Sequence, residues 1–161
     1  MRFLLLALAG LALVPLSAVS AEPHGGDHPE ARPFDQEADA SALIDAALAR
    51  AQIAEKRVIA VMGANWCHDS RGLAGWFAEP RFDAMLKPKY EIVYVDVGYK
   101  DRNIDIAKRF GVKAIKGTPT VLVLSADGAL LNRRSAPKWR NAASRTEEDI
   151  FTYFAQFSPE L

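Results

Sequence analysis

The chain has very little cysteine: Cys67 is the only one in 161 residues. A single cysteine excludes a fold held together by internal disulfides. The thiol of Cys67 is therefore either free or joined to another molecule. Any thiol chemistry in this protein has to run through one sulfur, not through a pair.

An excess of charge of one sign is also lacking. Lys and Arg together number 20, and so do Asp and Glu, which gives a formal net charge of zero. We therefore expect neither nucleic acid nor an anionic membrane as a partner. Long apolar runs are lacking too, because nothing after residue 21 is apolar enough to span a bilayer.

The first 21 residues have the pattern of a signal peptide. Arg2 precedes an apolar stretch over residues 3–16, and Val19-Ser20-Ala21 provides small residues for cleavage. We predict a cleavable signal peptide over residues 1–21, and hence a periplasmic or secreted protein without a lasting membrane anchor. About 140 residues remain, which is enough for one domain.

Residues 22–37 are rich in proline, glycine and charge, and they predict a flexible linker before a domain over residues 38–161. His24 and His28 flank Asp27 in this linker. A flexible linker offers no fixed coordination geometry. We therefore expect no metal site and no cofactor.

Cys67 lies where a predicted strand leads into a predicted helix. Residues 58–62 form a continuous apolar run, as in a buried central strand. The run breaks at residues 63–65, and helical spacing begins at Asp69. Unpaired N–H groups and the helix dipole at this junction favour a thiolate, which is the reactive form of cysteine. The alternative is a small buried cysteine that only fills space.

The rest of the chain alternates between helical and strand patterns, so we predict an α/β fold with a sheet covered by helices on both faces. Glu79-Pro80 predicts that the helix after Cys67 breaks and restarts. The other predicted elements are a helix over 43–51 capped by Asp39 or Ser41, a strand over 91–97, a helix over 101–110, strands over 120–124 and 129–132, and a last helix opened by a capping box of Ser144 and Glu147.

Two motifs carry a resemblance to a known family. Trp66-Cys67-His68-Asp69-Ser70, after an apolar strand, resembles the Trp-Cys-x-x-Cys site of the thioredoxin superfamily. Gly117-Thr118-Pro119-Thr120 resembles its cis-proline loop, and residues 93–97 and 107–112 resemble two further landmarks in the same order. The resemblance covers residues 38–158. It implies a thioredoxin-like three-layer fold with a central mixed β-sheet and helices on both faces.

The resemblance also implies roles for single residues. Cys67 would be the nucleophile, and Thr118 and Pro119 would bind substrate, with a cis bond that bares the backbone of Thr118 for strand addition. An ordinary trans proline that starts a strand is the alternative. Trp66 would form either a flat partner surface or part of the core. Independently of the resemblance, His68, when protonated, would favour the thiolate, and Asp69 would oppose it.

This sequence departs from the family pattern at two positions. Ser70 occupies the place of the resolving cysteine, and Val61 occupies the place of a buried acid. Both departures argue against an ordinary dithiol reductase cycle. The Ser70 hydroxyl would either donate a hydrogen bond to the Cys67 thiolate or else face solvent or bond within its helix.

A single thiol can still form mixed disulfides. Three activities remain: shuffling the disulfides of a client protein, capturing clients covalently, and exchange with a small thiol such as glutathione. We expect partners with thiols or disulfides and a monomeric protein. Two further readings stay open, a non-catalytic peptide-binding or chaperone module and a thiol sensor that forms a sulfenic acid. The sequence leaves open whether the protein is an enzyme.

Overall fold

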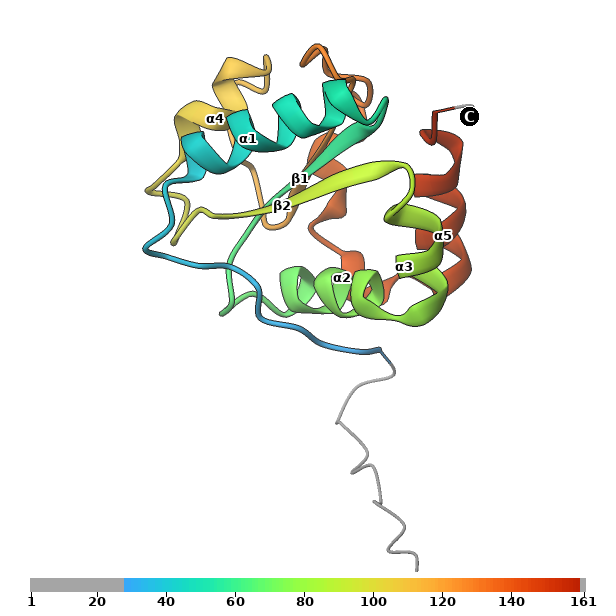
Figure 1. The fold of residues 1–161 in the computed structure, drawn as a ribbon. Coiled ribbons are helices and arrows are strands. Elements are labelled where there is room, and N and C mark those ends of the chain that lie inside the picture. Colours follow the sequence, from blue (N-terminus) through green and yellow to red (C-terminus); the bar gives the residue numbers. More distant parts are fainter. Residues whose placement is uncertain (1–27, 160–161) are drawn as a thin grey trace, which may run out of the picture.

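The central layer of the molecule is a three-stranded mixed sheet (Figure 1). The computed structural model describes residues 28–159, so the predicted signal peptide lies outside the described residues. The strands are β1 (Arg57–Gly63), β2 (Tyr90–Asp96) and β3 (Thr120–Leu124), in the order β2-β1-β3. β1 runs parallel to β2 and antiparallel to β3. The predicted mixed sheet is therefore confirmed.

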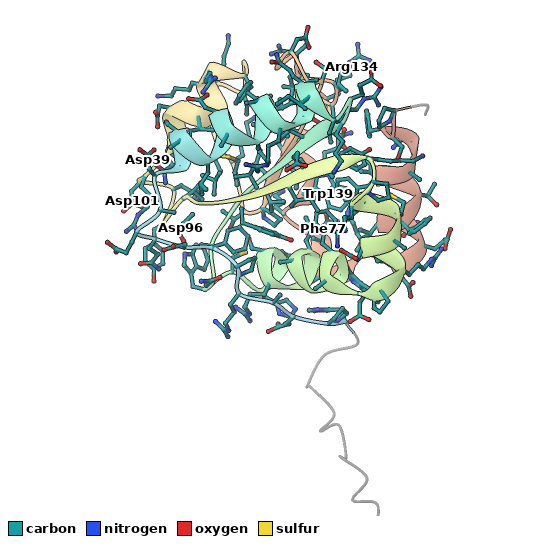
Figure 2. The ribbon with its side chains drawn as sticks, viewed as in Figure 1. Asp39, Phe77, Asp96, Asp101, Arg134 and Trp139 are labelled. Carbon is teal, nitrogen blue, oxygen red and sulfur yellow. The ribbon has the colours of Figure 1, made fainter. Side chains whose placement is uncertain are left out.

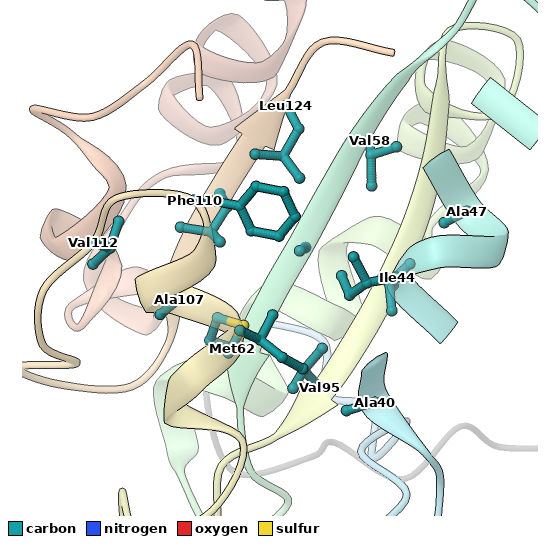
Figure 3. Close-up of a cluster of buried hydrophobic side chains, with 14 of the residues drawn as sticks. Ala40, Ile44, Ala47, Val58, Met62, Val95, Ala107, Phe110, Val112 and Leu124 are labelled. Atoms are coloured by element: carbon teal, nitrogen blue, oxygen red, sulfur yellow. The ribbon is translucent and has the colours of Figure 1, made fainter. Parts of the chain in front are cut away.

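Helices cover both faces of this sheet (Figure 1), which confirms the predicted three layers. One face carries α1 (Ala40–Ile53) and α4 (Ile104–Arg109), and the other carries α2 (His68–Ala78), α3 (Pro80–Leu86) and α5 (Glu147–Gln156). Side chains of a strand alternate between faces, so Met62 of β1 joins the core under α1 and Val61 joins the core under α2. Figure 3 shows the first of these cores, with Ile44 of α1 and Met62 of β1 among its labelled side chains.

No helix within residues 28–159 combines the length and apolar character needed to cross a membrane.

The N-terminal cap of α1 is the one that the sequence predicted, whereas that of α5 is a different residue. Asp39 caps α1 as predicted, because its carboxylate accepts a hydrogen bond from the Ala42 amide at 3.0 Å. The capping box predicted at Ser144 is wrong. Residues Ala142–Ser144 form a short 3-10 turn, and Thr146 caps α5 by accepting from the Asp149 amide at 3.1 Å.

The strand predicted over residues 129–132 is also wrong. Only an isolated bridge between Leu124 and Leu130 remains there. The buried Asn132 side chain takes over the pairing: it accepts from the Val123 amide and donates to the Val121 carbonyl, both at 2.9 Å. An amide side chain thus satisfies the backbone of β3 where a neighbouring strand would otherwise do so.

The flexible linker predicted over residues 22–37 needs correction from His28 onward, whereas residues 22–27 lie outside the described part. Phe34 is only 2% exposed and belongs to the core under α2. Its ring meets the ring of Tyr94 edge-on at 5.5 Å. Phe34 therefore anchors this segment on the domain, and Ala31 packs partly against the same core.

Candidate functional site

Cys67 is the residue immediately before the first residue of α2, at the N-cap position of the helix. Its side chain makes no capping hydrogen bond, and the residue is 8% exposed. The thiol instead donates to the Thr118 carbonyl, with 3.3 Å between sulfur and oxygen. The sulfur therefore lies at the strand–helix junction that the sequence predicted, at the N-terminus of α2.

The loop of Thr118 and Pro119 lies beside this sulfur. The peptide bond between the two residues is cis, and both residues are buried. They stand directly before β3, the strand that pairs with β1. The sheet thus brings together a cysteine and a proline loop that are 51 positions apart in the sequence.

Trp66 contributes an exposed aromatic surface next to Cys67. It is 47% exposed, and its indole stacks on the ring of Tyr99 with 5.1 Å between ring centres. The indole N–H donates to the Gly98 carbonyl at 3.0 Å, which fixes the ring. Sequence reasoning missed Tyr99, although its place just after the strand parallel to β1 was a usable signal.

Two aspartates shape the loop that holds Trp66. The buried Asp96 carboxylate accepts from the Gly98 amide at 2.8 Å, and Asp101 accepts from the Tyr99 amide at 2.9 Å. Figure 2 shows Asp96 and Asp101 at this end of the molecule. Val61, at the position that the resemblance assigns to a buried acid, is fully buried among apolar side chains.

Ser70 is fully buried, and its hydroxyl has no hydrogen-bond partner within residues 28–159. It therefore forms neither a bond to Cys67 nor a bond within its helix. The hydroxyl packs against the backbone of Gly63, where an added Cβ would lie 2.6 Å from Ser70 Oγ and 2.7 Å from the Phe34 ring. Glycine at this position is a steric requirement of the site.

Replacing Ser70 with alanine should raise the free energy of unfolding by up to about 1 kcal/mol. A buried hydroxyl without a partner carries a desolvation penalty, and alanine removes it at the cost of only one atom of packing. Urea denaturation of the Ser70→Ala variant beside the parent protein measures the change. A loss of more than about 1 kcal/mol would mean that the hydroxyl has a partner after all.

The two polar side chains that follow the cysteine have partners elsewhere. Asp69 accepts a hydrogen bond from the Ala143 amide at 2.9 Å, which ties α2 to the turn before α5. His68 is exposed, and its Nδ1 lies 3.1 Å from Glu30 Oε1. His68 and Asp69, which the sequence predicted to act on the thiol, thus both have partners other than the thiol.

Glu30 and Arg71 attach the segment before α1 to this site. Arg71 donates to Glu30 Oε2 at 2.9 Å and to the Trp66 carbonyl at 2.9 Å. The hydrogen bond from Arg71 holds the pKa of Glu30 below its usual value. The side chain of Asn65 bonds to both the amide and the carbonyl of Phe34, at 3.2 and 2.8 Å. Sequence reasoning missed these contacts because it treated the segment as a linker.

A basic pocket of about 580 Å³ adjoins the proline loop. Gly117 lies against Arg140, since an added Cβ would be 3.0 Å from the Arg140 Cβ. The pocket is therefore next to the loop that contacts the Cys67 sulfur. Its lining residues are Lys116, Pro137, Lys138, Arg140, Asn141 and Arg145.

Comparison with known proteins finds similarity over the part of the chain that contains Cys67 and Pro119. Residues 39–126 match the thioredoxin-like protein family. Among solved structures, the disulphide isomerase from Xylella fastidiosa Temecula1 superimposes with a TM-score of 0.73 and 31% sequence identity, over 78% of this chain and 96% of that chain. No curated protein sequence matches the chain.

Proposed function

Because this chain belongs to the thioredoxin-like family, we propose that it carries out thiol–disulfide exchange through the single sulfur of Cys67. One observation carries the proposal: the Cys67 sulfur lies at the N-terminus of α2 and 3.3 Å from the Thr118 carbonyl. The helix N-terminus has backbone N–H groups without helical partners beside the sulfur, and the neighbouring loop has backbone groups that can hydrogen-bond to an extended substrate.

The proposed exchange needs no external oxidant. The Cys67 thiolate attacks one sulfur of a client disulfide, a bond forms between the two sulfurs, and the second client sulfur leaves as a thiolate that takes up a proton. A second thiol then attacks the mixed disulfide and restores the Cys67 thiolate. When that thiol belongs to the client, the disulfide has moved and no net oxidation has occurred, as in an isomerase. When it is a small thiol, the client leaves as a mixed disulfide with that thiol, and a second small thiol completes its reduction and leaves as the disulfide of the small thiol.

Two surfaces beside Cys67 support a role for partners with thiols or disulfides. The exposed stack of Trp66 and Tyr99 provides a flat aromatic surface for a client chain. The basic pocket next to the proline loop has charges that suit the carboxylates of a small thiol such as glutathione. The predicted signal peptide would deliver the protein to a compartment where disulfides persist.

The proposal predicts that Cys67 reacts with iodoacetamide at pH 7 at least about ten times faster than cysteine in an unstructured peptide. It also predicts that oxidised glutathione forms a mixed disulfide with the protein, visible by mass spectrometry and reversed by a client thiol. The Cys67→Ala variant is the blank in both assays. Labelling no faster than that of the peptide would remove exchange chemistry as the function.

The exposed aromatic stack favours a second candidate function, non-covalent binding of peptides by the same face. Reduced and denatured client peptides would then bind equally well to the parent protein and to the Cys67→Ala variant. Fluorescence anisotropy with a labelled peptide measures both affinities, and a Tyr99→Ala variant tests the stack itself. Binding that disappears with Cys67 returns the function to covalent exchange.

A further inference from the structure

We infer that His28 and His68 form a binding site for a divalent transition-metal ion such as Zn²⁺, with Glu30 as the carboxylate that orients His68. His28 and Glu30 come from the segment before α1, and His68 is the first residue of α2. One potential ligand atom from each lies within 4.8 Å of the other two. The sequence prediction of no metal site rested on a flexible linker, whereas His28 is half-buried and Phe34 lies in the core.

The hydrogen bonds of the two imidazoles fix where their protons lie. Nδ1 of His28 is 3.1 Å from the Pro29 carbonyl, which can only accept, so Nδ1 must donate. Nδ1 of His68 is 3.1 Å from Glu30 Oε1, and a carboxylate also only accepts. A ring that carries a single proton therefore has it on Nδ1, and its Nε2 has a free lone pair.

The two Nε2 atoms lie close together. Nε2 of His28 and Nε2 of His68 are 3.0 Å apart. Two acceptors at this separation repel one another unless a positive charge lies between them. That charge is either a metal ion or a shared proton, and the arrangement around the two rings favours the metal.

The geometry suits a metal with nitrogen ligands. Two imidazole nitrogens on a tetrahedral Zn²⁺ are about 3.3 Å apart, because each Zn–N bond is about 2.0–2.1 Å. The 3.0 Å separation needs only a small outward movement to reach that value. Histidine ligands characteristically donate their other N–H to a carboxylate or a backbone carbonyl, and both rings do so here. Imidazole ligands select zinc, copper or nickel.

The surface of α2 holds His28 in place. An added Cβ on Gly72 would lie 3.0 Å from His28 Nδ1, and one on Gly75 would lie 2.3 Å from the Pro29 backbone. The Ala31 amide also donates to the Arg71 carbonyl at 3.1 Å. Both glycines are therefore needed where the segment crosses the helix, and the pair of histidines is positioned before any metal arrives.

The metal site does not depend on the proposed thiol chemistry. The Cys67 thiol donates to Thr118, whereas His68, the next residue, faces Glu30 and His28. A Cys67→Ala variant removes the thiol and leaves all three metal-site residues. Metal binding measured in that variant reports on the metal site alone.

Isothermal titration of the purified protein with Zn²⁺ tests the inference. We expect one Zn²⁺ per chain in the parent protein and in Cys67→Ala, and binding at least about tenfold weaker in His28→Ala and His68→Ala. His24→Ala is the matched control, since His24 belongs to the same histidine-containing stretch and lies outside the described residues. Nitrogen NMR of the imidazoles should show Zn²⁺ on Nε2 of both His28 and His68.

Three outcomes would overturn the inference. The first is no heat of Zn²⁺ binding to the parent protein, with NMR showing one proton shared by the two rings. The second is Zn²⁺ binding that His68→Ala leaves unchanged. The third is binding that His24→Ala removes, which would place the ion on the N-terminal stretch. Circular dichroism checks that each variant is folded, and His68→Gln replaces His68→Ala where the alanine variant is not.

Discussion

The Ser70→Cys variant should form an internal disulfide with Cys67 and reduce insulin catalytically in the presence of dithiothreitol, whereas the parent protein should not. Residues 67 and 70 are the N-cap and the third residue of α2, one helical turn apart. A thiol at position 70 would attack the mixed disulfide on Cys67, release the reduced client and leave a disulfide between the two cysteines. Dithiothreitol then reduces that disulfide, and the cycle repeats.

Insulin precipitation and a count of free thiols after mild oxidation measure these two effects. Ser70→Ala is the matched control, because it removes the same hydroxyl without supplying a sulfur. It should remain as inactive toward insulin as the parent protein. Two free thiols in oxidised Ser70→Cys would show that the second sulfur cannot reach the first, which would contradict the placement of residue 70 as the resolving position.

The Phe34→Ala variant should lose about 3–5 kcal/mol of its free energy of unfolding. Phe34 is 2% exposed, touches Tyr94 edge-on, and occupies the space that Gly63 leaves open. Truncation removes the apolar surface that the ring buries and leaves a cavity under the segment. The segment would then be held mainly by polar contacts at the surface. Urea denaturation measures the loss of stability.

Zinc titration of Phe34→Ala gives a second readout, since His28 reaches His68 only when the segment is docked. We expect Zn²⁺ affinity to fall with Phe34→Ala even where the protein remains folded. Ile53→Ala is the control, because Ile53 is 86% exposed and its truncation should change stability by no more than about 0.5 kcal/mol. A loss below about 1 kcal/mol for Phe34→Ala would show that the segment does not belong to the core.

Local patterns predicted much of the fold. The apolar run at residues 58–62 became β1, Glu79-Pro80 separates α2 from α3, and Asp39 caps α1. Each of these features depends on residues within one or two turns of each other. The predictions that failed depend on side-chain contacts that local sequence patterns do not show. Asn132 replaces a predicted strand because its amide can reach two backbone groups of β3, which no periodicity reveals.

The candidate site divides in the same way. The position of Cys67 at a strand–helix junction followed from the sequence, because an apolar run and a helical pattern meet there. The position of Thr118 and Pro119 beside Cys67 could be predicted only from the resemblance, since Thr118 is 51 positions from Cys67 in the sequence. The stack of Tyr99 on Trp66 was not predicted, because it depends on how the loop after β2 is placed relative to Trp66.

The sequence by itself determined that one sulfur, without an internal partner, stands at the start of a helix. Only the tertiary structure decided what surrounds it. The Ser70 hydroxyl turned out to be buried and unpartnered among the described residues. The segment from His28 to Phe34 turned out to be docked, which places His28 against His68 across 40 positions. Side-chain burial and long-range polar contacts are properties of the packed chain, because they depend on which surfaces meet and not on the order of residues within either surface.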